Sequence, residues 1–255
     1  MGAFLAGFRL QLRVVRSDAD YVMPLATIPL FAITFLAIVR HAGRDDLTGY
    51  AVMAPVLIAL WALALLDSGE IVEGDRWQGL LEPAVAAPAS FPVVVLGRVV
   101  AVTTIGLLSF AEVWLVARLA FGVWIEIEHP IELLLTLAAT AFAVSGTAVI
   151  MAALFVLSRT PRTFQNSLSF PFYVLGGVLV PVSFLPDWLE PVSRAIFLSW
   201  SADLLRDSLE EAAVDDFATR LGMVVLLGAV GFAIGYALLA RILHHARTEG
   251  SLGLV

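Results

Sequence analysis

The chain has no lysine and no cysteine among its 255 residues, and only 15% of its residues are charged. A phosphate-binding loop of the P-loop type needs a lysine to reach the nucleotide phosphates, so this sequence cannot supply that motif. Any such ATPase must be another polypeptide. The absence of cysteine excludes disulfides and thiolate chemistry. Four histidines give little scope for a metal cluster, and we expect no metal site.

What the chain has in excess is apolar side chains. Hydrophobic residues make up 60% of the sequence, and the mean hydropathy is +0.93. Soluble domains are nearer to half apolar and about a quarter charged, so this composition is typical of a membrane protein. No polar stretch is long enough to fold separately. We therefore expect one all-α membrane domain covering residues 1–255.

Six hydrophobic stretches are long enough to span a bilayer, which takes roughly 20 residues of helix. An even number of spans places both termini on one side. The basic residues favour the cytoplasmic side for the termini, since nine of the fifteen arginines fall there under this topology and cytoplasmic loops are enriched in basic residues. The predicted spans are 21–39, 50–66, 92–117, 131–157, 167–184 and 221–243.

Residues 1–18 precede the first span and have two distinct helical faces. Such a segment predicts an amphipathic helix lying in the membrane interface. Its apolar face holds Phe4, Phe8, Leu12 and Val15, and its basic face holds Arg9, Arg13 and Arg16.

The connection 68–91, between the second and third spans, is the longest one predicted on the cytoplasmic side. Its charged residues alternate with apolar ones, which predicts a short amphipathic helix ended by Pro83. The residues that form a motif here are Glu73, Asp75, Gly79, Leu80, Leu81, Glu82, Pro88, Gly97 and Arg98.

A second motif begins in the fifth span and is interrupted by prolines. Its residues are Leu175, Gly177, Pro181, Leu185, Pro186, Trp188 and Leu189, followed by Trp200, Asp203 and Arg206. Together the two motifs resemble those of ABC-2 exporter permeases, most nearly the compact drug-resistance permeases of the daunorubicin type. One departure is Phe197-Leu198, where that family often has Asn-Pro.

The resemblance implies how the chain is powered. In that family the element after the second span is a coupling helix, which docks on a separate ATPase subunit. It also implies a second permease chain, identical or homologous, with ATP and Mg bound by the partner ATPase and no cofactor on this chain. The coupling residues expected from the resemblance are Glu73, Asp75, Trp77, Gly79, Leu80, Leu81 and Glu82.

The segment 181–216 is too broken to span and too apolar at its start to be a free loop. Because irregular backbone survives in lipid only where it is buried in protein or lines a cavity, we expect 181–191 to form a re-entrant turn or half-helix. As a function we expect an outer gate, and the alternative is a solvated helix that caps the bundle. The gate residues would be Pro181, Leu185, Pro186 and Trp188.

Two further groups are candidates for the substrate path or for the seam between two permease chains. Glu112 is an acid well inside the third span, where a charge usually faces a cavity or the bundle interior. Hydrogen bonding within the bundle is an equal alternative. Three glycines of the sixth span predict close helix packing, within the chain or at the seam. The remaining candidates in the fifth span are Phe172, Tyr173, Gly176, Gly177 and Phe184.

We therefore expect the permease subunit of an ATP-driven exporter in the cell membrane. The chain itself is not an enzyme, and its cargo would be an amphipathic or hydrophobic small molecule or lipid. Polysaccharide or glycolipid export and ion-coupled secondary transport remain alternatives. An intramembrane serine protease is disfavoured, because Ser145 in the fourth span has no histidine near it in the predicted topology. The cargo and the choice between homodimer and heterodimer stay open.

Overall fold

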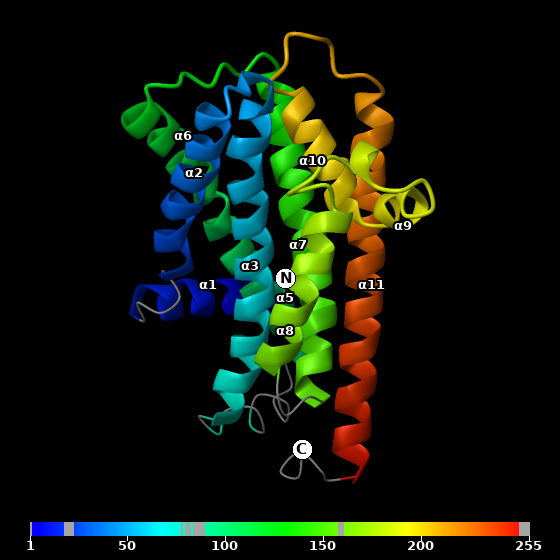
Figure 1. Cartoon of the computed structure of the whole chain (residues 1–255). Coiled ribbons are helices and arrows are strands. Elements are labelled where there is room, and N and C mark those ends of the chain that lie inside the picture. Colours follow the sequence, from blue (N-terminus) through cyan, green and yellow to red (C-terminus); the bar gives the residue numbers. More distant parts are fainter. Residues whose placement is uncertain are drawn as a thin grey trace.

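The computed structural model describes residues 2–17, 23–77, 79, 83, 90–157 and 161–249, and no strand occurs among them. The long helices form one bundle, and α1 (Gly2–Ser17) lies across it (Figure 1). Turns 42–47, 122–129 and 208–216 lie together at the end that is drawn uppermost in Figure 1, which we call the upper end. Helices α3 (Thr48–Trp77) and α11 (Phe217–Glu249) end at the opposite, lower end. The predicted all-α fold is confirmed.

Three helical stretches of the described chain are long and apolar enough to cross a membrane: Phe91–Phe121, Pro130–Leu154 and Phe217–Ile242. Two shorter apolar stretches, Ala26–His41 and Thr48–Leu63, lie in α2 (Met23–His41) and α3 (Thr48–Trp77). These helices make the chain a multi-pass membrane protein. That the chain crosses the membrane six times stays a prediction.

The predicted third span is two helices, α5 (Phe91–Gly106) and α6 (Leu108–Phe121), which meet at Leu107. Just before this break, the hydroxyls of Thr103 and Thr104 donate to the carbonyls four residues earlier, at 2.9 and 2.7 Å. Threonines that bond back in this way bend helices. The one-helix prediction missed this bend because both halves are apolar.

The predicted fifth span is also broken. Helix α8 (Pro161–Leu175) ends nine residues before Phe184, where the predicted span ended. The cause is Gly177, which adopts a left-handed φ of +66° and carries the chain out of the helix. Three short helices follow: η3 (Val182–Phe184), α9 (Glu190–Arg194) and α10 (Phe197–Asp207).

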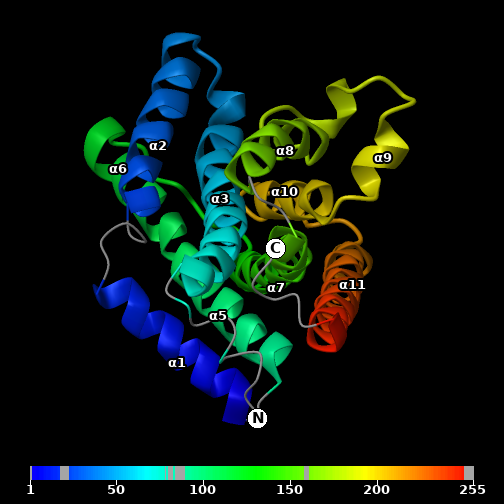
Figure 2. The same ribbon diagram turned by 90° about the horizontal axis from the view of Figure 1, so that it is seen from below.

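Helices α7 (Pro130–Leu157) and α11 (Phe217–Glu249) pack along each other through small residues (Figures 1 and 2). A Cβ added at Gly146 would lie only 2.5 Å from the carbonyl oxygen of Gly228. Gly231 lies against Gly146, and Gly235 lies against the backbone of Val149 and Ile150. The three glycines of the sixth predicted span therefore pack within the chain. Packing within the chain was one of the two interpretations, and the seam between two chains was the other.

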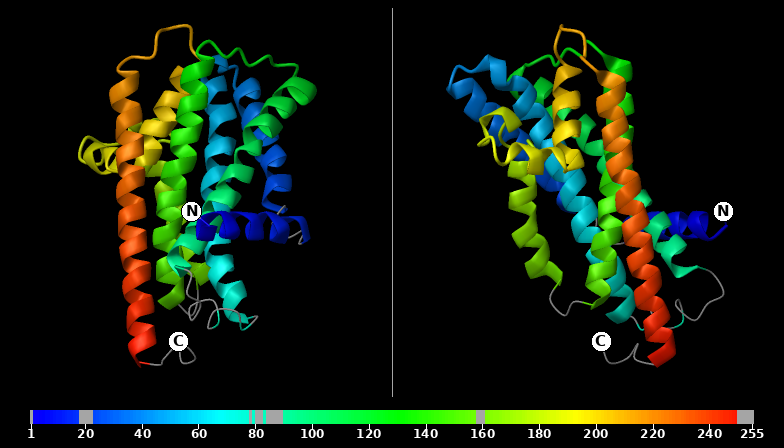
Figure 3. Two further views of the ribbon diagram at one scale, coloured as in Figure 1. Left: turned by 180° about the vertical axis from the view of Figure 1, so that it is seen from behind. Right: turned by 90° about the vertical axis from the view of Figure 1, so that its right-hand side faces the viewer.

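Helix α1 packs against α5 at the margin of the bundle, as Figures 2 and 3 show from below and from the side. The two backbones touch at a pair of glycines. A Cβ at Gly7 would lie 2.2 Å from the carbonyl oxygen of Val94, and one at Gly97 would lie 2.1 Å from that of Phe4. The three arginines of the predicted basic face, Arg9, Arg13 and Arg16, are exposed, so the amphipathic pattern is confirmed.

Helix α3 is the central element, in contact with α2, α5, α6, α7, α8 and α10. Its Trp61 is 1% exposed and stacks on Phe172 of α8, with ring centroids 4.6 Å apart. The ring of Phe197, at the start of α10, lies 6.4 Å away. This aromatic group fixes the broken fifth segment to the centre of the bundle.

Candidate transport and coupling sites

The turn after α8 is held by a buried arginine. Arg206 in α10 is 4% exposed, and its Nη2 donates to the carbonyls of Gly177 and Val178 at 2.5 and 3.1 Å. Its guanidinium also lies 3.7 Å above the ring of Tyr50 in α3. Arg206 therefore satisfies two carbonyls of the turn that follows α8, which explains why a base stands at this place in the motif.

Two other residues of the motif hold the same region. Trp200 donates its indole N–H to the carbonyl of Arg194 at 2.8 Å, and the Arg194 guanidinium lies 4.9 Å above the Trp200 ring. Arg194 also donates to Asp203 at 2.7 Å. The hydroxyl of Ser193 donates to the carbonyl of Leu175 at 2.5 Å. The last two residues of short helix α9 thus fasten it to both α8 and α10.

The residues predicted as an outer gate lie on the protruding part of this segment, beside α9 in Figure 3. Pro181 and Leu185 are half-buried, whereas Pro186 is exposed and Trp188 is 73% exposed. Phe184, a candidate for the substrate path, is 75% exposed. The prolines mark the ends of short helices and turns, so a broken segment is observed where one was predicted. Whether it acts as a gate stays a prediction.

The other candidates for the path in the fifth segment make contacts inside the chain. Phe172 stacks on Trp61, and Tyr173 is 8% exposed. A Cβ at Gly176 would lie 2.7 Å from the side chain of Leu198. Gly177 forms the turn that ends α8. These four positions support the fold of the segment. Among the side chains of α8 that the structure describes, the large apolar ones that are exposed are Phe170 and Val174.

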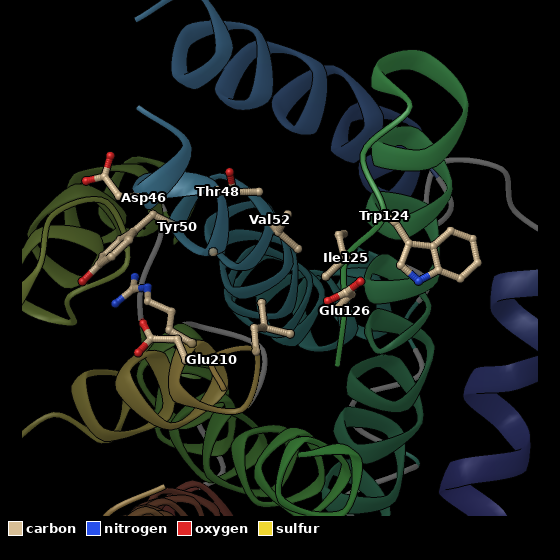
Figure 4. A pocket seen from close by; sticks show the side chains of 11 residues that line it. Asp46, Thr48, Tyr50, Val52, Trp124, Ile125, Glu126 and Glu210 are labelled. Carbon is tan, nitrogen blue, oxygen red and sulfur yellow. The ribbon is translucent and has the colours of Figure 1, made fainter. Parts of the chain in front are cut away.

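A pocket of about 290 Å³ opens at the upper end, between the start of α3, the turn after α6 and the end of α10 (Figure 4). Carboxylates of Asp46, Glu126 and Glu210 line it together with the buried Arg206. Asp46 also forms an exposed ion pair with Arg44 at 2.7 Å, and this hydrogen bond lowers the pKa of Asp46. Tyr50 and Trp124 add aromatic faces. Sequence reasoning missed this pocket because its residues come from three distant segments.

Glu112 lies in α6 and is half-buried. Its Oε2 is buried and has no hydrogen-bond partner among the described residues. The position of Glu112 tests neither of its two interpretations, a contact with cargo and a hydrogen bond within the bundle. Ser145, by contrast, has its hydroxyl 3.0 Å from that of Thr103 in α5 and 2.8 Å from the carbonyl of Ala141 within α7, so it joins two helices of the bundle.

The structure describes only part of the predicted coupling region. Helix α3 runs without a break from Thr48 to Trp77, so Glu73, Asp75 and Trp77 continue the helix of the second span beyond its apolar stretch and do not form a separate helix. Gly79 is exposed with φ of +66°. The remaining coupling candidates, Leu80, Leu81 and Glu82, lie outside the described residues.

Asp75 forms a buried contact that the sequence did not predict. Its Oδ2 accepts a hydrogen bond from Arg98 Nη1 of α5 at 2.6 Å. Burial raises the pKa of Asp75, and the charge and hydrogen bond of Arg98 oppose that effect. Arg98 Nε also donates to Gln11 Oε1 of α1 at 2.9 Å. The motif residues had indicated Asp75 and Arg98 separately, but nothing in the sequence paired them.

Comparison with known proteins agrees with these motifs. The family model for the ABC-2 type transporter matches residues 4–209, which is most of the chain. The chain is also similar to Nodulation protein J of Neorhizobium galegae, with 28% identity over 149 residues. That alignment covers 58% of this chain and 56% of the relative, so the chain spans about half the length of the curated relative that it matches.

Proposed function

Because the chain belongs to the ABC-2 type transporter family, we propose that it is the membrane subunit of an ATP-driven exporter and that a separate ATPase chain powers it. The family match over residues 4–209 carries this proposal. The sequence supports the division of labour, since a chain without lysine cannot supply a P-loop. The chain would reside in the cell membrane with both termini in the cytoplasm, as the arginine distribution favours.

The cargo in this proposal is amphipathic: a hydrophobic small molecule or a lipid with a polar group. The upper pocket supports it, because its charged and aromatic lining suits a polar group. Apolar side chains of α6 near that end are exposed, with Leu115 at 49% and Leu119 at 80%. In this proposal the polar group of the cargo enters the pocket and its apolar part contacts side chains of this kind. A glycolipid or polysaccharide has polar groups that suit the same pocket, so it remains the second cargo class.

A second permease chain completes the proposed exporter. The exposed apolar residues of α8 and the protruding segment are a surface that a second copy or a homologous chain would cover: Phe170, Val174, Phe184, Trp188 and Val192. In this arrangement the path for cargo runs between the two chains and beside the broken fifth segments.

Reconstitution tests the proposed function. The permease, purified together with its ATPase, is placed in lipid vesicles with fluorescent amphiphiles of differing head groups. We expect ATP-dependent movement of a subset of these probes, which stops when vanadate is added. Ion-coupled transport is the alternative that the unpartnered Oε2 of Glu112 would favour. Full transport by the permease alone under a proton gradient would overturn the ATP-driven proposal.

The ATPase contact is tested by the double variant Trp77→Asp and Leu81→Asp. Carboxylates in the apolar part of the predicted contact would lose their water on docking, and unpaired buried charges are costly. We expect at least a tenfold loss of ATPase in pull-down on the tagged permease, which corresponds to about 1.4 kcal/mol. The control is Leu119→Asp at the upper end, where the side chain is exposed. Undiminished co-purification of the ATPase would contradict the assignment of residues 77–82.

A further inference from the structure

Three helices meet at a buried polar cluster formed by Gln11 of α1, Asp75 of α3 and Arg98 of α5. Arg98 joins the other two, through Nη1 to Asp75 at 2.6 Å and through Nε to Gln11 at 2.9 Å. The side chain of Arg98 is 6% exposed and that of Asp75 is 15% exposed, while Gln11 is fully buried. We call this group the 11–75–98 cluster.

A buried ion pair of this kind adds little net stability, because both charges lose their hydration. Removing one partner is nevertheless costly, since the other charge is left buried and unpaired. The cluster therefore fixes the positions of three helices relative to one another more than it stabilises the fold. The hydrogen bonding of the cluster is incomplete on the α1 side, because Gln11 Nε2 is buried without a hydrogen-bond partner among the described residues.

The cluster lies where motion from an ATPase would enter the chain. Asp75 is two residues before Trp77, the first apolar residue of the proposed ATPase contact. Between the cluster and the centre of the bundle, α3 is one continuous helix, so its lower end cannot move without carrying Asp75. The contact of Gly7 with Val94 and that of Gly97 with Phe4 leave no room between α1 and α5. Together these contacts join α1, α3 and α5 into one mechanical unit.

We propose that Arg98 is a positioning residue that transmits movement of the lower end of α3 to α1 and α5 during transport. This inference rests on the proposed function, because it presumes an ATPase acting at residues 77–82. When the ATPase displaces α3, Asp75 carries the Arg98 guanidinium with it, and Arg98 carries Gln11. Helix α1 then follows α3, although the two helices are far apart in the sequence.

The test uses the complete permease–ATPase complex in lipid vesicles. The chain has no natural cysteine, so a single spin label can be placed at Leu10→Cys on α1, where the leucine is 46% exposed. We expect the label spectrum to differ between the ADP and ATP–vanadate states. In Arg98→Met, which keeps an unbranched apolar stem but removes the guanidinium, that difference disappears. Cargo moved per ATP hydrolysed falls about tenfold, the typical size of an energetic coupling between sites.

Controls separate this inference from the proposed function. Arg241→Met, an exposed arginine of α11, should leave both the spectrum and the transport ratio unchanged. If the unmodified chain neither binds the ATPase nor transports with ATP, the proposed function fails. If it does both, and Arg98→Met keeps the spectral change and the full transport ratio, the role of Arg98 is overturned while the exporter stands.

Further variants keep the test decisive if Arg98→Met does not assemble. Asp75→Asn preserves shape and a hydrogen-bond acceptor but removes the charge, and it should give the same uncoupling. The exchange Asp75→Arg with Arg98→Glu restores an ion pair, and the carboxylate at 98 can accept from the free Nε2 of Gln11. We expect this exchange to recover at least part of the transport ratio. An Asp75→Asn complex that assembles and transports at the full ratio would contradict the inference.

Discussion

Replacing Gly97 by alanine is expected to displace α1 from the bundle. The added Cβ would lie 2.1 Å from the carbonyl oxygen of Phe4 and 2.9 Å from the backbone nitrogen of Phe8. Both are backbone atoms, so no side chain can rotate to make room and the whole helix must move. Overpacking of a tight contact costs about 1–3 kcal/mol. Displacement of α1 also lengthens the hydrogen bond between Arg98 and Gln11, which adds to that cost.

Two measurements check this result in the purified, detergent-solubilised chain. Thermal unfolding followed by size-exclusion chromatography should show a lower midpoint. Trypsin should cut faster at the exposed arginines of α1, which become more accessible when the helix separates from α5. The control is Gly222→Ala in α11, where an added Cβ meets no atom within 4 Å. If the Gly97 variant unfolds and is cleaved like the control, the glycine contact between α1 and α5 does not exist in the protein.

The comparison of α1 with its sequence shows what a local pattern can predict. Period and charge placed an amphipathic helix at residues 1–18, and the structure has α1 at Gly2–Ser17. The same pattern could not identify α5 as the partner, because the contact joins Gly7 to a segment about ninety residues later. A glycine carries no side chain that would signal a close approach. Gln11 was overlooked for a related reason, since its partner Arg98 is equally distant.

The broken fifth segment was predicted from its prolines, because proline and irregular backbone have local causes. What holds the break was not predicted. Two of its acids are held in ion pairs, since Asp203 pairs with Arg194 at 2.7 Å and Asp207 pairs with Arg220 at 2.6 Å. The motif named Arg206, but nothing in the sequence indicated that this charged side chain is buried. Composition shows the charges of a segment but not the neighbours that the fold brings to them.

The upper pocket and the bend at Leu107 illustrate the same limit. Hydropathy identifies a span without reporting its shape, so α5 and α6 were read as one helix. The pocket depends on that shape, because the turn after α6 supplies Trp124 and Glu126 to its wall. Its other residues come from the start of α3 with the turn before it and from the end of α10 with the turn after it, which the sequence separates by more than a hundred positions. A site assembled in this way has no motif of its own.

Replacing Arg206 by methionine is expected to destabilise the fifth segment strongly. The variant removes the donor to the carbonyls of Gly177 and Val178, which lie in the turn that follows α8. Each buried polar group left without a partner costs about 1–3 kcal/mol, so a loss of several kcal/mol is expected. Thermal unfolding of the purified chain measures this loss. Export should fall as well, because the turn lies beside the proposed path.

Two companion variants decide what Arg206 contributes. Arg206→Lys keeps the positive charge near Asp203, but a single ammonium lacks the planar fork of donors that holds two carbonyls. If hydrogen bonds to the turn are the main contribution, Lys recovers only part of the stability. If the charge is the main contribution, Arg206→Lys recovers nearly all of the stability. Arg44→Met is the control, since Arg44 forms an ion pair at 2.7 Å in which both side chains are more than half exposed, and no measurable change in unfolding is expected. An Arg206→Met variant as stable as this control would show that the buried clamp does not hold the turn.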